Sequence, residues 1–297
     1  MNTGKHSVNR ASHFIMATKK RNPSSARYFK TSSIKEENGL QFTRRLFVMR
    51  HGERCDFAFG KQWVARSFDE KGNYTQADLN LPVSLIPRDS QNDFLKDSPL
   101  TELGMFQARS TGQALRRADV DIKHVYSSPS FRCVQTAQNV IDGMQSNAKI
   151  CIEPSAFEWC GWYKNGMPSW LSPAYLSSHG YRVNAEHKPL MEAKDLKHDE
   201  TVPEYYDRCH KLVQHILKLH EEDGGDILIV AHAGSLDTFT RQLCGKKIRT
   251  SQEMHQILCN FTYCCLCCLA YYTKPGKWLL TNPPIPTLQE FDWKVLL

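Results

Sequence analysis

Four short runs of mostly apolar residues constrain the fold of this chain more than any other feature of its sequence. Runs of this length are too short for ordinary helices and are typical of strands that are buried on both faces of a sheet. The runs are Leu46-Phe47-Val48-Met49, His124-Val125-Tyr126-Ser127, Ile150-Cys151-Ile152 and Asp226-Ile227-Leu228-Ile229-Val230-Ala231. We therefore expect a largely parallel sheet whose two faces are covered by other elements.

Helical patterns lie between these runs. Thr101 can cap one helix, and Thr201 and Glu204 have the spacing of a capping box at the start of another. The residues expected on the buried faces are Met105, Ala108, Gly112 and Leu115 in the first helix, and Tyr206, Cys209, Val213, Ile216 and His220 in the second. Strands that alternate with helices predict an α/β fold, a three-layer α/β/α sandwich with a mostly parallel sheet. Residues 56–98, which contain Gly60, Gly72, Pro82 and Pro87, are predicted to be a long loop-rich insertion near the functional site.

The basic charge of the chain is concentrated at its beginning. The net charge is +7, and residues 1–34 contain seven basic residues and no acidic one: Lys5, Arg10, Lys19, Lys20, Arg21, Arg27 and Lys30. The remainder is therefore close to neutral, which argues against a nucleic-acid-binding domain. We predict a basic, disordered tail over residues 1–42 and one domain over residues 43–297. The alternatives for the tail are a mitochondrial transit segment and a segment that binds acidic membrane lipid.

The cysteines and the apolar segments predict a cytoplasmic protein. The chain has 11 cysteines, an odd number, and no export signal precedes them, so reduced thiols are expected rather than a disulfide framework. The longest apolar run, residues 261–272, is too short to cross a bilayer as a helix. A mitochondrial location is the alternative if the basic segment is a transit peptide.

Charged side chains follow three of the predicted strands at the point where each strand ends. His51, flanked by Arg50 and Arg54, follows the first run, and His232 follows the last. Arg132 falls in the first turn of a helix that follows the second run, where free backbone N–H groups favour an anion. The carboxyl ends of parallel strands meet at one edge of the sheet, where ligands bind. Three guanidinium groups and two imidazoles converging there suit a phosphate dianion.

The motifs that carry these residues resemble one known family. In chain order they are Phe47-Val48-Met49-Arg50-His51-Gly52-Glu53-Arg54, Ser127-Ser128-Pro129-Ser130-Phe131-Arg132-Cys133-Val134-Gln135-Thr136-Ala137, Phe157-Glu158-Trp159, Leu228-Ile229-Val230-Ala231-His232-Ala233 and Leu280-Thr281-Asn282-Pro283-Pro284. They resemble the histidine phosphatase (phosphoglycerate mutase-like) superfamily. The resemblance is to the branch of the suppressor-of-T-cell-receptor-signalling (ubiquitin-associated and Src-homology-3 domain-containing) phosphatase domains and the ecdysteroid-phosphate phosphatases. It runs from about residue 44 to residue 293.

The resemblance implies roles for six residues. His51 would be the nucleophile that becomes a phosphohistidine, and Glu158 the general acid that protonates the leaving oxygen. The residues that would bind the phosphoryl oxygens are Arg50, Arg54, Arg132 and His232. The implied activity is that of a phosphomonoesterase that needs no metal and no cofactor and acts on phosphotyrosine proteins or on a bulky aryl or steroid phosphate. No spacing of His, Cys and Asp in the sequence matches a metal site.

Two other functions remain as alternatives. A phosphoglycerate mutase would need more basic residues near Glu158 than the one, Lys164, that follows it before residue 170. A phosphate-binding regulatory module without catalysis would be favoured by loss of His51, Glu158 or His232, and all three are present. The resemblance implies neither ubiquitin nor proline-rich partners, because only a short basic tail precedes the phosphatase motifs. The family's domains tend to dimerise, so a homodimer stays open.

Two clusters of side chains have less certain roles. Aromatic residues after Glu158 could border a bulky leaving group, although core packing is the commoner role of such residues: Trp159, Trp162, Tyr163 and Trp170. Residues 264–268, four of them cysteine, are predicted to form a strand with thiols on both faces rather than a zinc site or a palmitoylation site. Cys133 follows Arg132 directly, so oxidation of its thiol is a hypothetical route to loss of activity.

Overall fold

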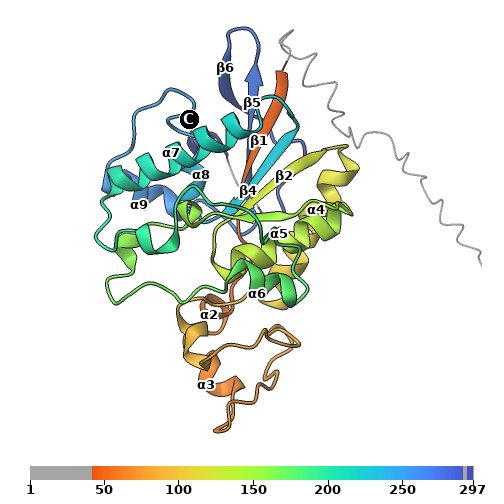
Figure 1. Ribbon diagram of the computed structural model, residues 1–297, viewed down its shortest axis with the longest axis vertical. Helices are drawn as coiled ribbons and strands as arrows, with labels where there is room; N and C mark the ends of the chain where they lie inside the picture. The colour runs from red at the N-terminus through yellow and green to blue at the C-terminus, as the bar shows by residue number, and fades with distance from the viewer. Residues whose placement is uncertain (1–41, 290–292, 297) are drawn as a thin grey trace, which may run out of the picture.

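The computed structural model describes residues 42–289 and 293–296 (Figure 1). Its centre is a six-stranded sheet in the order β3-β2-β4-β1-β5-β6. The strands are β1 (Phe42–Arg50), β2 (Ile122–Ser127), β3 (Ile150–Ile152), β4 (Asp226–Ala231), β5 (Leu266–Tyr272) and β6 (Lys277–Thr281). The first four pair in parallel, whereas β5 and β6 run antiparallel to their neighbours. The four predicted strands are confirmed, in a sheet that is mostly parallel.

Helices cover both faces of this sheet. Side chains of α4 (Glu102–Arg117) and α5 (Phe131–Met144) pack with Phe47 and Leu228 on one face. Side chains of α7 (Val202–Leu219), α8 (Ser235–Thr238) and α9 (Ser251–Leu258) pack with Leu46 and Ile227 on the other. Neighbouring strand residues thus point to opposite faces, as their period of two requires. The three-layer α/β/α arrangement predicted from the sequence is confirmed.

The two predicted helix starts are also confirmed. The hydroxyl of Thr101 accepts a hydrogen bond from the amide of Gly104 and begins α4, and Thr201 and Glu204 form a complete capping box before α7. The predicted apolar stripe of α7 is buried as far as Ile216. The helix ends at Leu219, so His220 lies just beyond its last turn and is only partly buried.

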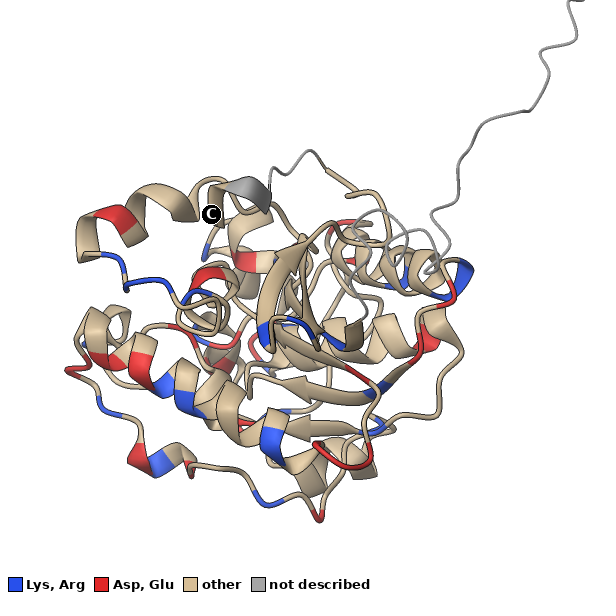
Figure 2. Cartoon of the chain, turned by 90° about the horizontal axis from the view of Figure 1, so that it is seen from above, with Lys and Arg blue, Asp and Glu red and all other residues tan. Residues whose placement is uncertain are grey.

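The remaining elements are short. They are α2 (Cys55–Ala58), α3 (Trp63–Ser67), α6 (Pro173–Ser178), and the 3-10 segments Gln91–Leu95, Pro154–Ala156, Cys160–Trp162, Ala193–Asp195 and Trp293–Leu296. No helix in the described residues is long and apolar enough to span a membrane. Figure 2 shows basic and acidic residues interspersed over the helices and loops, in keeping with the near-neutral charge expected for this part of the chain.

The predicted insertion, residues 56–98, is loop-rich but has a small core of its own. Trp63 and Phe94 meet edge to face, with ring centroids 5.9 Å apart, and Leu81 is buried with them. The segment lies below the sheet in Figure 1, beyond the carboxyl end of β1. It is tied back by Asp97, which accepts a hydrogen bond from the amide of Phe131 at 2.8 Å. The insertion is therefore fixed to the start of α5, where Arg132 lies.

The cysteine-rich strand begins later than the sequence predicts. Cys264 has a positive φ of 54° and Cys265 lies in the same turn, so β5 starts at Leu266. Cys267 and Cys268 then face opposite sides of the sheet, as expected. All 11 cysteines are free thiols, in agreement with the expectation of reduced residues. Of the predicted tail, residue 42 is the first residue of β1, and residues 1–41 lie outside the described residues.

Candidate active site

His51 lies directly beyond β1, with its backbone fixed between two strands. Its amide donates to the carbonyl of Ala231 at 3.0 Å, and its carbonyl accepts from Cys264 at 3.2 Å. The Nδ1 atom lies 2.8 Å from the carbonyl oxygen of Gly52. A carbonyl can only accept, so Nδ1 carries the hydrogen and the lone pair is on Nε2. The imidazole therefore presents Nε2 as the free nitrogen.

The charge state of His51 also favours nucleophilic attack. Its side chain is almost fully buried, and this burial lowers its pKa well below the ordinary value. The charges of Arg132, Arg50 and Arg54 lower the pKa further. The ring is therefore neutral at neutral pH, and three guanidinium groups lie near enough to act on it.

The glycine after His51 is required by close packing. A Cβ atom on Gly52 would lie 2.5 Å from the carbonyl oxygen of Gly104, in the first turn of α4. The amide of Gly52 donates to the hydroxyl of Thr136 at 3.0 Å. The loop that carries His51 thus lies against both α4 and α5, which limits the movement of this side chain.

Arg132, Glu158 and His232 form one contact cluster. The Nη2 atom of Arg132 donates to Oε1 of Glu158 at 2.6 Å and to Nδ1 of His232 at 3.1 Å. The rings of His232 and His51 lie with their centroids 5.6 Å apart. Arg132 is fully buried, and its Nε and Nη1 atoms find no hydrogen-bond partner among the described residues. Buried donors of this kind are costly unless an acceptor reaches them, and an oxyanion would supply acceptors.

The other two arginines are held at the rim. Arg50 donates to the carbonyl of Phe261, and its guanidinium lies 4.3 Å from the ring centre of Tyr263. Arg54 donates from Nε and Nη2 to the two carboxylate oxygens of Asp56 at 2.6 and 2.7 Å. Arg54 must therefore share its charge between Asp56 and any bound phosphate. With these two, the structure places all six predicted residues around one site.

Glu158 is ionised in this arrangement. Burial alone would raise its pKa, but the neighbouring His232, Arg132 and Arg54 oppose this effect and bring the pKa below its ordinary value. His232 is itself neutral, since burial lowers its pKa well below the ordinary value. Arg132 and Arg54 are therefore the cations that hold the carboxylate ionised. A phosphate that engaged these arginines would weaken their hold on Glu158 and make its protonation easier.

Sequence reasoning assigned no role at the site to two residues that contact the cluster. Ser128 lies with its Oγ 2.8 Å from Nε2 of His232, and so orients the ring. Tyr163 donates its hydroxyl to Oε1 of Glu158 at 2.5 Å. Tyr163 was expected only as an aromatic wall. The motif position of Ser128, at the end of β2, was a signal that could have identified it.

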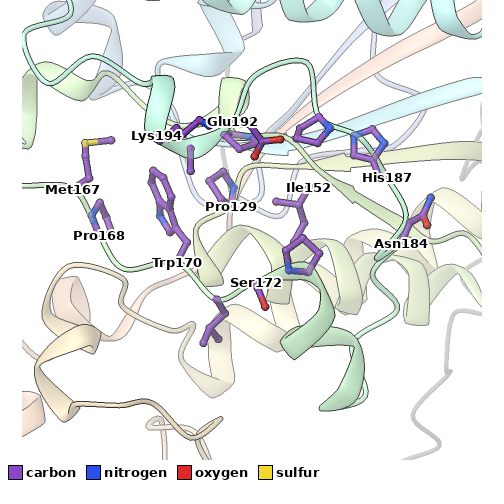
Figure 3. Close-up of a pocket in the computed structure, with 15 residues that line it drawn as sticks. Pro129, Ile152, Met167, Pro168, Trp170, Ser172, Asn184, His187, Glu192 and Lys194 are labelled. Carbon is purple, nitrogen blue, oxygen red and sulfur yellow. The ribbon is translucent and has the colours of Figure 1, made fainter.

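A cavity close to the site is distinct from the predicted phosphate-binding cluster. It has a volume of about 540 Å³ and is lined by Pro129, Ile152, Trp170 and His187 among others (Figure 3). Trp170 packs on Phe157 with ring centroids 4.7 Å apart, and Phe157 packs in turn on His232. Phe157 therefore lies between this cavity and His232, and none of the six predicted site residues lines the cavity. The four aromatic residues predicted to border a leaving group do not form one surface, because Trp159 and Trp162 pack against each other and away from Trp170.

The structure argues against the proposed oxidation of Cys133. The thiol is fully buried, which raises its pKa to about 12, and the thiolate is the form that reacts with peroxide. We expect the phosphatase activity to survive millimolar hydrogen peroxide with less than about a twofold loss. The measurement is residual hydrolysis after treatment and quenching, for wild type and Cys133→Ala. An inactivation that Cys133→Ala prevents would contradict the expectation.

The described residues place no metal site at this cluster. Among residues 42–289 and 293–296, the set of three side chains close enough to share a metal ion is His124, His220 and Asp223, and none of them belongs to the six. The site is instead built from guanidinium groups, which can neutralise a phosphate without a metal.

Comparison with known proteins identifies the family. Residues 90–283 match the model of the histidine phosphatase superfamily (branch 1). The chain belongs to this family. The matched span contains Arg132, Glu158 and His232 and begins after His51. The resemblance seen in the sequence and the predicted phosphoglycerate mutase-like fold are both confirmed.

Two curated relatives are similar over most of the chain. An ecdysteroid-phosphate phosphatase of Drosophila melanogaster is 40% identical over 263 residues, which are 85% of this chain and 34% of that protein. The ubiquitin-associated and SH3 domain-containing protein B of Homo sapiens is 38% identical over 263 residues, 86% of this chain and 40% of that protein. The chain thus spans well under half the length of these relatives.

A solved structure agrees in fold. The ecdysone phosphate phosphatase of Bombyx mori, in complex with tungstate, superposes with a TM-score of 0.70 at 33% sequence identity. The match covers 86% of this chain and 100% of that one.

Proposed function

We propose that this chain is a metal-independent phosphomonoesterase that works through a phosphohistidine on His51. The observation that carries the proposal is the state of that imidazole, which is buried and neutral, with Nδ1 bonded to a carbonyl and Nε2 free. Arginine side chains surround it, as phosphoryl transfer requires. Family membership supports the same reaction class.

In the first step, Nε2 of His51 attacks phosphorus and the bond to the ester oxygen breaks. Arg50, Arg54 and Arg132 stabilise the charge on the phosphoryl oxygens, each charge-assisted hydrogen bond contributing about 1.5–3 kcal/mol. Protonated Glu158 delivers a proton to the leaving oxygen as the alcohol departs. Its contact with Arg132 at 2.6 Å places the carboxyl beside the arginine that would hold the phosphate.

In the second step, water attacks the phosphohistidine. The Glu158 carboxylate accepts a proton from the water, the N–P bond breaks, and inorganic phosphate and neutral His51 are released. His232 is oriented by Ser128 and Arg132, and in both steps its Nε2–H would donate to a phosphoryl oxygen in place of Ser128. One carboxyl group thus serves as acid and then as base.

We propose a phosphotyrosine protein or a bulky aryl or steroid phosphate as the substrate. The similarity to the ecdysteroid-phosphate phosphatases of Drosophila melanogaster and Bombyx mori supports a steroid phosphate, whereas phosphotyrosine is a prediction from the sequence resemblance. Tyr163, which contacts Glu158, is the aromatic side chain available to border such a group. A phosphate ester is in either case the ligand expected from the family.

The competing functions receive less support. A phosphoglycerate mutase needs additional cations to bind the carboxylate of its substrate. The described hydrogen bonds of Glu158 join it to Arg132 and Tyr163 and to no lysine, which argues against this function. A non-catalytic phosphate-binding module would not need a neutral, oriented His51. A cytoplasmic location and a homodimer both remain predictions, the first supported by 11 free thiols.

The test is hydrolysis of p-nitrophenyl phosphate in excess EDTA, with a phosphotyrosine peptide and a steroid phosphate assayed in parallel. We expect turnover that EDTA does not reduce, and the preferred substrate would identify the class. A well-folded wild type that binds tungstate or phosphate but turns over none of the three substrates would favour the binding module instead.

A further inference from the structure

Two histidines and an aspartate meet at the edge of the sheet opposite to the active site. His124 lies near the start of β2, His220 follows the last turn of α7, and Asp223 lies in the turn that leads into β4. Residues 51 and 232 follow the carboxyl ends of β1 and β4, whereas these three lie at the amino ends of β2 and β4. Their contacts are therefore independent of the phosphate-binding cluster.

The donor atoms of the three side chains already have spacings close to those of a metal site. Oδ2 of Asp223 lies 3.2 Å from Nδ1 of His220 and 3.6 Å from Nε2 of His124. Ligand atoms bound tetrahedrally at about 2.0–2.2 Å from zinc are about 3.3 Å apart. All three donor atoms lie within 4.8 Å of one another. The carbonyl oxygen of Gly224 lies 2.8 Å from Nε2 of His124 and accepts a hydrogen from it in the metal-free protein. If this hydrogen moves to Nδ1, Nε2 becomes a ligand and the same carbonyl is a fourth donor.

A second layer of contacts can hold the tautomer of His220 that a metal needs. Its Nε2 atom lies 2.7 Å from the hydroxyl of Tyr126, which can accept a hydrogen there. The lone pair is then on Nδ1, the atom that faces Asp223. Metal-binding histidines commonly have their second nitrogen held in this way by a neighbouring group.

Only small movements would complete the site. The imidazoles of His124 and His220 are stacked, with centroids 3.5 Å apart and planes inclined by 18°, and a metal lies in the plane of each ring that binds it. One ring must therefore turn about its Cβ–Cγ bond. Asp223 is more than half exposed, so it can follow, and an ion can enter from solvent. Exposed Glu221 and Glu222 add negative charge beside it, which offsets Arg44 where that residue donates to the carbonyl of His220.

We propose that His124, His220 and Asp223 bind a divalent transition metal, with Zn²⁺ as the best match. Two imidazoles, one carboxylate and an oxygen donor suit Zn²⁺ and exclude Mg²⁺ and Ca²⁺ as preferred ions. Both histidines bind the ion as neutral imidazoles, so the hydrogens that Nδ1 of His220 and Nε2 of His124 carry in the metal-free protein move to the other nitrogen of each ring. The ion ties the end of α7 and the following turn to β2, and so has a structural role.

The experiment is equilibrium dialysis of the EDTA-treated full chain against Zn²⁺, followed by thermal unfolding of the same samples. We expect wild type to bind one equivalent more than His124→Asn or Asp223→Asn, whose affinity at this site falls by more than about 100-fold. Zn²⁺ at 100 times the Kd should raise the Tm of wild type by about 5–10 °C. Tyr126→Phe, which keeps all ligands, should weaken binding by about 10–100-fold.

The controls separate this site from adventitious binding. His215→Asn removes an exposed histidine of the same helix and should bind Zn²⁺ as wild type does. Co²⁺ bound here should lack a thiolate charge-transfer band, which would instead reveal binding to cysteine. In EDTA, hydrolysis by His124→Asn and Asp223→Asn should equal that of wild type. Equal Zn²⁺ binding and Tm shift in wild type and Asp223→Asn, whose exposed side chain is not needed for folding, would overturn the proposal, as would no binding by wild type.

Discussion

Replacement of His51 by alanine should lower kcat for every phosphate ester by at least about 10⁴-fold, the scale seen when a catalytic nucleophile is removed. In the wild type, Nε2 of this ring has no competing hydrogen bond among the described residues, and burial keeps the ring neutral. Alanine leaves no nitrogen to accept the phosphoryl group, whereas the arginines remain. The variant should therefore still bind phosphate or tungstate while turnover is lost.

The measurement is single-turnover hydrolysis with a radiolabelled substrate, quenched in alkali so that a phosphohistidine survives. Label should stay on the wild-type protein and be absent from His51→Ala. His215→Ala, which removes an exposed histidine on α7, serves as the matched control and should retain full activity. A His51→Ala protein that keeps more than a tenth of wild-type activity would exclude His51 as the nucleophile.

The sequence predicts the parallel part of the fold well because local signals and tertiary structure agree there. The run Asp226–Ala231 is apolar and bounded by Gly225, and β4 has the predicted limits. The Thr101 and Thr201 caps likewise depend on residues three positions apart. Where the outcome depends on distant partners, prediction fails. The insertion over residues 56–98 looks structureless in sequence because its small core joins residues as far apart as Trp63 and Phe94.

The site residues also fall into two groups, those that local sequence signals predict and those that depend on distant contacts. His51, Arg132 and His232 could be predicted because each follows a strand, and parallel strands bring their ends together. Glu158 does not follow a strand, and only the family resemblance identified it. Its contacts with Arg132 and Tyr163 join a helix start to a loop. The sequence analysis did not identify His124, His220 and Asp223 as a set. Almost 100 residues separate His124 from the other two, so the three residues form no motif with a recognisable metal-ligand spacing.

Replacement of Glu158 by glutamine should lower the rate more for substrates with a basic leaving group than for substrates with a weakly basic one, because only the former need a general acid. We expect kcat/KM to fall by about 10²–10⁴-fold for a phosphotyrosine peptide, whose phenolate is a strong base. For p-nitrophenyl phosphate, whose leaving group is a far weaker base and needs little protonation, the fall should be at most about tenfold. Glutamine keeps an oxygen that can accept from Arg132 and Tyr163, so the geometry of the site is retained. Glu186→Gln, an exposed carboxylate elsewhere, is the control.

The pH dependence of the wild type follows from the same carboxylate. Arginine charge lowers the pKa of Glu158 in the free protein, so the proton that the leaving group needs must arrive with the substrate monoanion. A phosphate monoester loses that proton near pH 6. Above about pH 6, kcat/KM for the phosphotyrosine peptide should therefore fall about tenfold per pH unit, whereas below it the rate should level off. The decline should flatten in Glu158→Gln, which neither receives nor delivers the proton. A wild-type rate that stays constant from pH 6 to 8 would mean that another group, of higher pKa, protonates the leaving oxygen, and Tyr163, which already donates to Glu158, would then be the first residue to replace.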